Sequence, residues 1–358
     1  MQSARRDLWD NPMGTDGFEF VEYTGPDPAA LAELFERMGF VAAARHRSKN
    51  VTLYRQGDVN FILNAEPESF AQAFARLHGP SVCALAFRVA DAAKAYQRAI
   101  SLGAKPVHGK VGPMELNIPA IEGIGGSLIY LVDRYGERTI YDVDFTPLAA
   151  DMAAASGVGL ADIDHLTHNV HRGRMQLWAE FYERLFNFRE IRYFDIEGRL
   201  TGLRSKAMTS PDGRIRIPIN ESADDKSQIA EYLEAYHGEG IQHIALATAD
   251  IYASVEALQR RAISFMSVPD AYYEAVDARV PGHGEDLTRL RRDRILIDGA
   301  PAAGQGLLLQ IFTETVIGPI FFEIIQRKGN RGFGEGNFRA LFEAIERDQI
   351  RRGVLAST

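Results

Sequence analysis

Apolar and polar positions along the chain follow the same order twice. In each half, a stretch with the pattern of a strand leads into an amphipathic helix, and further strands follow. The apolar runs are short and are bounded by Gly, Pro, Asn and Asp, as is typical of strands. Three pairs of segments match between the halves: 17–40 with 164–188, 82–102 with 241–260, and 127–134 with 320–327. The chain therefore predicts one large internal repeat, much longer than the unit of a solenoid.

Strands dominate the repeated unit, in which a strand and a helix are followed by more strands. This order favours an α+β protein with curved mixed sheets, two in each half and forming open barrels, over a doubly wound parallel sheet. A chain of 358 residues is also longer than a single core usually grows, so two tandem domains are expected. We place an N-terminal domain at residues 1–150 and a C-terminal domain at 158–358, joined by a linker rich in small residues at 147–157.

Three positions in the second half carry side chains of the kind that bind metals, where the first half carries Phe, Ala or Tyr. The pairs are His165 with Phe18, to within one or two residues, His243 with Ala84, and Glu323 with Tyr130. Each of the three lies in the middle of an apolar strand and is expected to be buried. A carboxylate buried without a compensating charge is strongly destabilising, so Glu323 needs a cationic partner.

Two imidazoles and one carboxylate are the ligand set of non-haem Fe(II), which they bind on one face while substrate and dioxygen share the open positions. Zinc accepts the same ligands, but its catalytic sites usually present a His-Glu-x-x-His helix, which this sequence lacks. A single buried His is more often a hydrogen-bonded core residue than a ligand. Three such residues at matching positions of one repeat favour a metal site over core histidines. We therefore expect one iron per chain and the active site in the C-terminal barrel.

Amide side chains accompany the same strands, at Gln242, Gln310 and Asn220. Buried amides need hydrogen-bond partners, and two interpretations fit: they pair with the backbone or one another, or they orient a polar aromatic substrate. The glycine-rich segment 332–338 precedes apolar residues at helical spacing. It lacks the spacing of a nucleotide-binding loop. It favours a hinge that carries an aromatic helix over a pocket, and a simply packed terminal helix is the alternative.

The composition of the chain excludes several kinds of binding partner and location. The 40 basic and 48 acidic side chains give a net charge of -8 with no long basic cluster, so nucleic acid is not an expected partner. The single cysteine, Cys83, excludes an intrachain disulfide. The longest apolar stretch, 307–325, is interrupted by polar residues and a proline, so no membrane span is expected. These features indicate a cytoplasmic protein.

Five segments together resemble the 4-hydroxyphenylpyruvate dioxygenase family of the vicinal oxygen chelate superfamily, and the resemblance covers nearly the whole chain. The segments are 164–170, 240–245, 308–312, 322–327 and 332–338. The resemblance implies that His165, His243 and Glu323 bind Fe(II). It also implies a polar pocket of Ser205, Asn220, Gln228, Gln242, Gln310 and Asn337, and an apolar and aromatic wall of Phe312, Phe321, Phe333, Phe338 and Leu341.

The resemblance further implies a reaction, in which 4-hydroxyphenylpyruvate and O2 give homogentisate and CO2 in tyrosine and phenylalanine catabolism. The 2-oxo acid of the substrate replaces a separate 2-oxoglutarate, and Gln242 and Gln310 hold a substrate oxygen as catalytic residues. A homo-oligomer is expected from the family. Three alternatives stay open: a 4-hydroxymandelate synthase, which shares the metal, the substrate and the decarboxylation; an extradiol dioxygenase, which releases no CO2; and a non-catalytic module that binds an aromatic ligand.

Overall fold

The computed structural model describes residues 7–109, 112, 114–148, 157–197, 202–224, 227–334 and 336–337. In the first half the elements are β1 (Phe18–Thr24), α1 (Pro28–Arg37), β2 (Val41–His46), β3 (Val51–Gln56), β4 (Val59–Asn64), α2 (Phe70–His78), β5 (Ser81–Arg88), α3 (Ala92–Ser101), β6 (Pro106–Val107), β7 (Ala120–Glu122), β8 (Leu128–Val132), α4 (Tyr141–Asp144) and β9 (Phe145–Pro147).

The second half repeats this order and adds short helices. Its elements are β10 (Leu160–Val170), α5 (Met175–Phe186), β11 (Arg189–Glu197), β12 (Gly202–Thr209), β13 (Arg216–Ser222), α6 (Gln228–Tyr236), β14 (Gly240–Thr248), α7 (Ile251–Arg260), α8 (Asp270–Glu274), α9 (Val276–Arg279), α10 (Leu287–Asp293), β15 (Leu296–Gly299), β16 (Leu307–Phe312) and β17 (Phe321–Lys328). Within the described ranges, no helix combines the length and the apolar character needed to cross a membrane.

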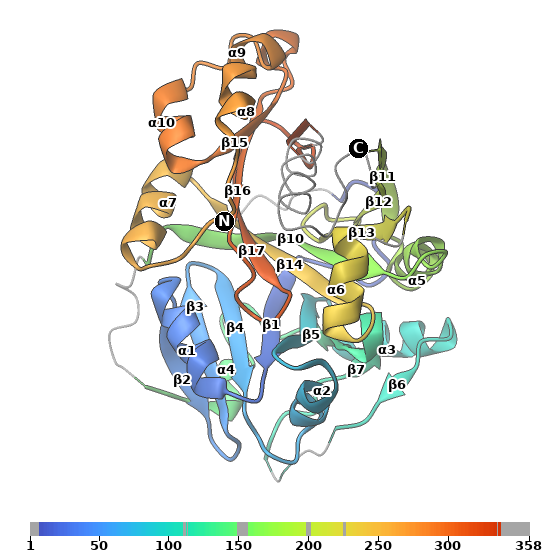
Figure 1. Cartoon of the computed structure of the whole chain (residues 1–358). Coiled ribbons are helices and arrows are strands. Elements are labelled where there is room, and N and C mark those ends of the chain that lie inside the picture. Colours follow the sequence, from blue (N-terminus) through green and yellow to red (C-terminus); the bar gives the residue numbers. More distant parts are fainter. Residues whose placement is uncertain are drawn as a thin grey trace.

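Each half forms one mixed sheet, and the two sheets lie against each other in the molecule (Figure 1). The strand orders are β9-β2-β3-β4-β1-β5-β8-β7-β6 and β11-β12-β13-β10-β14-β17-β16-β15, so strand follows strand in the same arrangement, with β9 added in the first. The predicted α+β class and the duplicated, curved mixed sheets are confirmed. The expectation of two sheets in each half was wrong, because antiparallel pairing of β1 with β5 and of β10 with β14 joins the two units of a half edge to edge.

The pairing register tests the equivalences between the halves. Tyr130 pairs with Ala86, and Glu323 pairs with Ala245. Ala86 and Ala245 each lie two residues after the matched pair Ala84 and His243, so both matches are confirmed. His165 also pairs with Ala245, whereas Phe20 is the residue that pairs with Ala86. The counterpart of His165 is therefore Phe20 and not Phe18. The two lie on opposite faces of the sheet, because Glu19 between them is an extra residue: Phe18 pairs with Phe87 in the core between the sheets, and Phe20 pairs with Ala86 on the other face.

Helix starts are equivalent as well. Ser69 and Ser227 are the N-caps of α2 and α6, and their hydroxyls accept from the backbone N–H groups of Gln72 and Ala230. Residue 72 in the first half thus corresponds to residue 230 in the second. Serine is favoured at this position because its oxygen satisfies an N–H that has no partner inside the helix.

The main core lies between the two sheets and is shared by both halves. Phe322 of β17 stacks against Phe61 of β4 at 5.9 Å between ring centroids, and Phe87 of β5 meets Phe186 of α5 at 5.2 Å. The opposite face of the first sheet is filled by a separate apolar cluster that includes Phe20. The corresponding face of the second sheet carries the polar residues described next. The division into domains at 147–157 stays a prediction; β9 ends at Pro147, β10 begins at Leu160, and 149–156 lie outside the described residues.

Candidate metal centre

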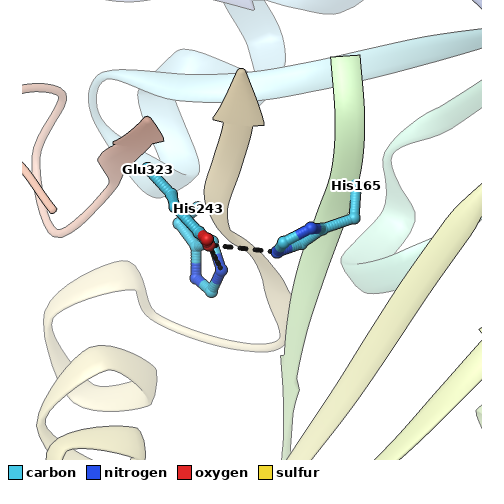
Figure 2. A group of neighbouring side chains, drawn as sticks. All are labelled: His165, His243 and Glu323. Atoms are coloured by element: carbon cyan, nitrogen blue, oxygen red, sulfur yellow. Dashed lines mark ion pairs between the residues drawn. The ribbon is translucent and has the colours of Figure 1, made fainter. Parts of the chain in front are cut away.

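His165, His243 and Glu323 come from three adjacent strands, β10, β14 and β17, and their side chains point toward one another (Figure 2). Glu323 Oε2 lies 3.1 Å from His165 Nε2 and 3.4 Å from His243 Nε2. One ligand atom from each of the three falls within 4.8 Å of the others, and in the described part of the chain no other three His, Cys, Asp or Glu residues form such a group. All three side chains are buried, with Glu323 fully inaccessible.

A bulged residue precedes each histidine. Along β10 the register runs from Ile163 to His165 while β14 advances by one residue, so Asp164 is the extra residue. Along β14 the register likewise skips Gln242. A bulge re-aims neighbouring side chains, and here it brings the preceding residue beside the ring: Asp164 Oδ1 lies 2.9 Å from His165 Nδ1, and Gln242 Oε1 lies 3.0 Å from His243 Nδ1.

These contacts fix which nitrogen of each imidazole is free to bind a cation. An acceptor beside Nδ1 holds the proton there, so Nε2 of the neutral ring keeps its lone pair. Both Nε2 atoms then face Glu323 Oε2, and among the described residues no group donates a hydrogen bond to that oxygen. Three electron-pair donors directed at one point fit a bound metal ion. Thr167 Oγ1 lies 2.9 Å from His243 Nε2, so its hydroxyl has to turn away when a cation binds.

The charges of the site are coupled. Burial alone raises the pKa of Glu323, but the two imidazoles outweigh it and hold the pKa at about 2. Burial disfavours the charged form of His165, yet Glu323 and Asp164 raise its pKa above the ordinary value. Burial lowers the pKa of His243, which therefore stays neutral more readily. Glu323 is thus an anion, and the histidines differ in how readily a proton competes with a metal.

Asp164 is clamped by two arginines. Arg327 donates from Nε and Nη2 to its two oxygens at 2.7 and 2.8 Å, and Arg216 donates at 3.1 Å. Burial opposes ionisation of Asp164, but the arginines hold its pKa well below the ordinary value. Arg327 also donates to the carbonyl of Gly332 at 2.5 Å, and its guanidinium lies 5.8 Å from the centre of the Phe333 ring. His165 is thereby connected through one carboxylate to the segment that follows β17.

The other oxygen of Glu323 is held by an amide chain. Gln310 on β16 donates to Glu323 Oε1 at 2.7 Å and accepts from Asn337 Nδ2 at 2.9 Å, and Asn337 accepts from the Tyr272 hydroxyl at 2.7 Å. Gly334 makes this approach possible: it has a φ of +74°, and a Cβ there would lie 2.0 Å from Gln310 Oε1. Gln310 and Asn337 fit the first of the two interpretations made from the sequence, in which buried amides pair with one another.

Aromatic rings surround the histidines. Phe321 stacks on His243 with 4.9 Å between centroids, Phe312 presents an edge to the same ring at 6.3 Å, and Phe333 lies 5.7 Å from His165. These rings limit the access of water to the site. Phe338 and Leu341, which the resemblance assigns to the same wall, lie outside the described residues.

The remaining predicted pocket residues lie toward the other end of the same sheet. Ser205 on β12 and Asn220 on β13 are buried and face each other across the strand pair. Gln228 is the first residue of α6 and is half-buried. The sequence interpretation assigned no role to Asp164, Thr167, Asn169 or Tyr272. A buried carboxylate next to a ligand histidine was a signal for Asp164; nothing in the sequence alone singled out the other three.

Comparison with known proteins identifies the family. The model for "Hydroxyphenylpyruvate dioxygenase, HPPD, N-terminal" matches residues 9–146, and the model for "Glyoxalase/Bleomycin resistance protein/Dioxygenase superfamily" matches residues 162–276. Among solved structures, a xylose isomerase-like TIM barrel/4-hydroxyphenylpyruvate dioxygenase fusion protein aligns with a TM-score of 0.80 and 37% identity over 95% of this chain and 54% of that one, so the chain spans about half of the fusion protein. A mutant of 4-hydroxymandelate synthase from Streptomyces coelicolor aligns with a TM-score of 0.81 and 27% identity over 94% of this chain and all of that one.

Full-length relatives are more similar still. Hemolysin VllY from Vibrio vulnificus is 65% identical over 350 residues, which are 96% of this chain and 98% of that protein. The 4-hydroxyphenylpyruvate dioxygenase of Pseudomonas aeruginosa is 64% identical over 348 residues, which are 96% of this chain and 97% of that protein. The chain therefore belongs to the 4-hydroxyphenylpyruvate dioxygenase family.

Proposed function

We propose that this chain converts 4-hydroxyphenylpyruvate and O2 to homogentisate and CO2, with one Fe(II) held by His165, His243 and Glu323, in the catabolism of tyrosine and phenylalanine. The observation that carries the proposal is the convergence of these three buried side chains, with both Nε2 atoms facing a carboxylate oxygen that has no hydrogen-bond donor among the described residues, in a chain 64% identical to a 4-hydroxyphenylpyruvate dioxygenase. Fe(II) bound there supplies open positions for a 2-oxo acid and for dioxygen.

The chain's own residues contribute orientation and the exclusion of water. Asp164 and Gln242 hold the protons on Nδ1 of the two histidines, and Gln310 holds Oε1 of Glu323, so that Nε2, Nε2 and Oε2 remain directed at the metal. This geometry gives Gln310 a positioning role. Gln242 and Gln310 reach a substrate oxygen only if these amides exchange partners when substrate binds, and we propose that they do so.

The substrate pocket extends from the metal along the same face of the sheet. Phe312, Phe321 and Phe333 form its wall near the histidines, and Phe338 and Leu341 are proposed to complete it. The polar residues Ser205, Asn220, Gln228 and Asn337 are proposed to bind the oxygen atoms of the substrate. A hydrophobic pocket with a few placed polar groups is the usual form of a site for a small aromatic ligand.

The chemistry balances without a separate 2-oxoglutarate. Loss of the substrate's carboxylate as CO2 supplies two electrons to dioxygen, one oxygen atom enters the new carboxylate of the side chain, and the other enters the ring as the side chain moves to the neighbouring carbon. The substrate is thus its own reductant. Oxygen consumption is expected to depend on 4-hydroxyphenylpyruvate and to be indifferent to added 2-oxoglutarate.

The test uses purified protein reconstituted anaerobically with Fe(II). Oxygen uptake with 4-hydroxyphenylpyruvate, iron per chain and the identity of the product are measured for the wild type, for Glu323→Gln, and for Tyr130→Phe at the equivalent position of the first half. We expect stoichiometric iron and homogentisate for the wild type and Tyr130→Phe, and loss of both iron and activity for Glu323→Gln. Iron near zero in the wild type with unchanged activity in Glu323→Gln would reject the proposal.

A 4-hydroxymandelate synthase is the second candidate, because a structure of that enzyme superposes over 94% of the chain. It consumes the same substrate, so chromatography and mass spectrometry of the product separate the two. Release of CO2 separates both from an extradiol dioxygenase, and turnover separates all three from a non-catalytic aromatic-ligand binder. The cytoplasmic location, the homo-oligomeric state and the lack of nucleic-acid and membrane partners stay predictions from the sequence; sedimentation measures the oligomer.

A further inference from the structure

Asn169, near the end of β10, is a fully buried amide that the mechanism so far does not use. Neither its Oδ1 nor its Nδ2 has a hydrogen-bond partner in the described structure, and the same holds for Asn220 Oδ1 on the neighbouring strand. Buried amides are almost always paired, and an unpaired one costs free energy. Two adjacent amides with free hydrogen-bonding atoms therefore indicate that something else supplies their partner.

The strand direction places Asn169 on the same face as the metal ligands. Leu166 and Val170 point into the core shared by the two sheets, and His168 Nε2 lies 2.8 Å from the hydroxyl of Tyr182 on α5. Successive side chains alternate along a strand, so residue 169 faces the same way as Thr167 and His165. It lies four residues beyond His165, about 13 Å along β10.

Asn169, Asn220 and Ser205 form a row of polar side chains across three neighbouring strands, four residues along β10 from His165. Asn169 pairs in register with Asn220 of β13, which pairs with Ser205 of β12. On the other side it pairs with Gly240 of β14, which contributes no side chain. The two amides are thus directly beside each other, and no neighbour on β14 satisfies Asn169.

The first half of the molecule provides an internal comparison. By register, Thr24 corresponds to Asn169 and Asn64 to Asn220. Thr24 donates to the carbonyl of Asn64 at 3.2 Å and accepts from the Gln72 amide at 3.0 Å, and Asn64 Nδ2 donates to Glu22 at 2.7 Å. All these polar groups are satisfied within the chain.

The second half lacks the groups that would satisfy its row. The position of Gln72 is occupied by Ala230, and that of Glu22 by Thr167, whose hydroxyl lies against His243. The half that carries the metal ligands therefore leaves its amides unpaired at the position where the half without ligands pairs them. The unpaired amides are therefore a feature of the half with the metal ligands and not of the fold that both halves share.

We infer that Asn169 is a specificity-determining residue that binds, together with Asn220, the phenolic hydroxyl of the substrate. The inference rests on the proposed function. A phenol offers one donor and an acceptor, and the pair of amides offers the complementary oxygen and N–H groups. The length of the substrate fits this placement. An extended 2-oxo acid with its ring, bound to the metal at one end and hydrogen-bonded at the other, spans about the 13 Å that separates His165 from Asn169 along β10.

The experiment compares 4-hydroxyphenylpyruvate with phenylpyruvate, which has the same 2-oxo acid and no hydroxyl. Wild type, Asn169→Leu and Asn169→Ser are loaded with Fe(II), and kcat/KM for each acid and anaerobic Kd for each acid are measured. A site built to bind a hydroxyl discriminates strongly against an analogue without it. We expect the preference for the hydroxylated acid to fall at least tenfold in Asn169→Leu, mainly through the hydroxylated acid, and by less in Asn169→Ser.

Thr24→Val is the matched control, since it removes the paired group at the equivalent position. It is expected to lower the melting temperature of the metal-free protein and to leave the substrate preference unchanged. Asn169→Leu is expected to leave that melting temperature unchanged or to raise it, because the amide it removes has no partner in the free protein.

Two outcomes overturn the inference: a substrate preference within twofold of wild type in both Asn169 variants, or a loss of melting temperature in Asn169→Leu as large as in Thr24→Val with the preference retained. If Asn169→Leu does not fold, the preference of Asn169→Ser decides. A wild type that neither binds nor turns over 4-hydroxyphenylpyruvate would instead reject the proposed function itself, which these measurements show separately.

Discussion

The ion pair between Asp164 and Arg327 is expected to contribute substantially to stability, in contrast to most ion pairs of this chain. Asp164 is buried and Arg327 is 17% exposed, and two charge-assisted hydrogen bonds of 2.7 and 2.8 Å join them. Breaking a buried pair costs about 3 to 5 kcal/mol. Partial exposure of Arg327 and the remaining contact from Arg216 reduce that figure. We therefore expect a coupling free energy of about 2 to 3 kcal/mol.

A double-mutant cycle measures this coupling. Asp164→Asn, Arg327→Met and the double variant are unfolded in urea without metal, at pH 7, where Asp164 is ionised because its pKa lies well below the ordinary value. Asp270 and Arg294, joined at 2.6 Å but 63% and 40% exposed, serve as the control pair and should give less than about 1 kcal/mol. A coupling below about 0.5 kcal/mol for Asp164 and Arg327 would refute the reasoning. Asp164→Asn should also weaken Fe(II) binding by about 10- to 100-fold, as loss of a residue that orients a ligand usually does.

Three further perturbations test other parts of the site. Gly334→Ala is expected to destabilise the protein and to lower its iron affinity, because the added Cβ meets Gln310 Oε1 and the φ of +74° disfavours Ala; unchanged iron binding would contradict the contact. Burial lowers the pKa of His168 to about 3 from 6.5, so His168 contributes stability above pH 6.5 that is lost as the pH falls toward 3. The difference in unfolding free energy between wild type and His168→Gln should shift by about 1.4 kcal/mol between pH 7.5 and 5.5, to the detriment of wild type, and a pH-independent difference would argue against it. Tyr272→Phe should cost about 1 to 2 kcal/mol in urea unfolding by leaving Asn337 Oδ1 without its donor; no loss would show that this hydrogen bond is dispensable.

The sequence was sufficient to predict the repeat, the α+β class and the convergence of three ligand-type residues. This worked because successive side chains of a strand point to opposite faces of the sheet. A match between regular strands of the two halves therefore also predicts which face each matched side chain occupies. His243 and Glu323 matched Ala84 and Tyr130 without error, since the pairing of β14 with β17 and that of β5 with β8 are regular through these residues. His165 was matched two residues early, because the second half has more residues between this strand and the next one: Phe20 and Phe40 are 20 positions apart, whereas His165 and Phe188 are 23.

The groups that support the ligands could not be predicted, for the same reason. Regular alternation puts Asp164 and His165 on opposite faces, and only the bulge brings the carboxylate beside the imidazole. The clamp by Arg327 joins residues 163 positions apart, and which buried amides lack partners depends on every neighbour of Asn169. Such facts are properties of contacts between strands and not of any single segment.

Both halves keep the bulges, and this bears on what the metal does for the fold. Register places Glu19 and Cys83 of the first half at the bulges that Asp164 and Gln242 occupy in the second. Glu19 even keeps an arginine partner, Arg88, at 2.6 Å. Yet the ring of Phe20 meets Tyr130 at 5.6 Å where the second half places His165 and Glu323. A sheet with these bulges thus forms with apolar side chains at this position as well as with metal ligands. We therefore expect the metal to bind to a site whose shape is already fixed by the backbone and by the ion pairs of Asp164.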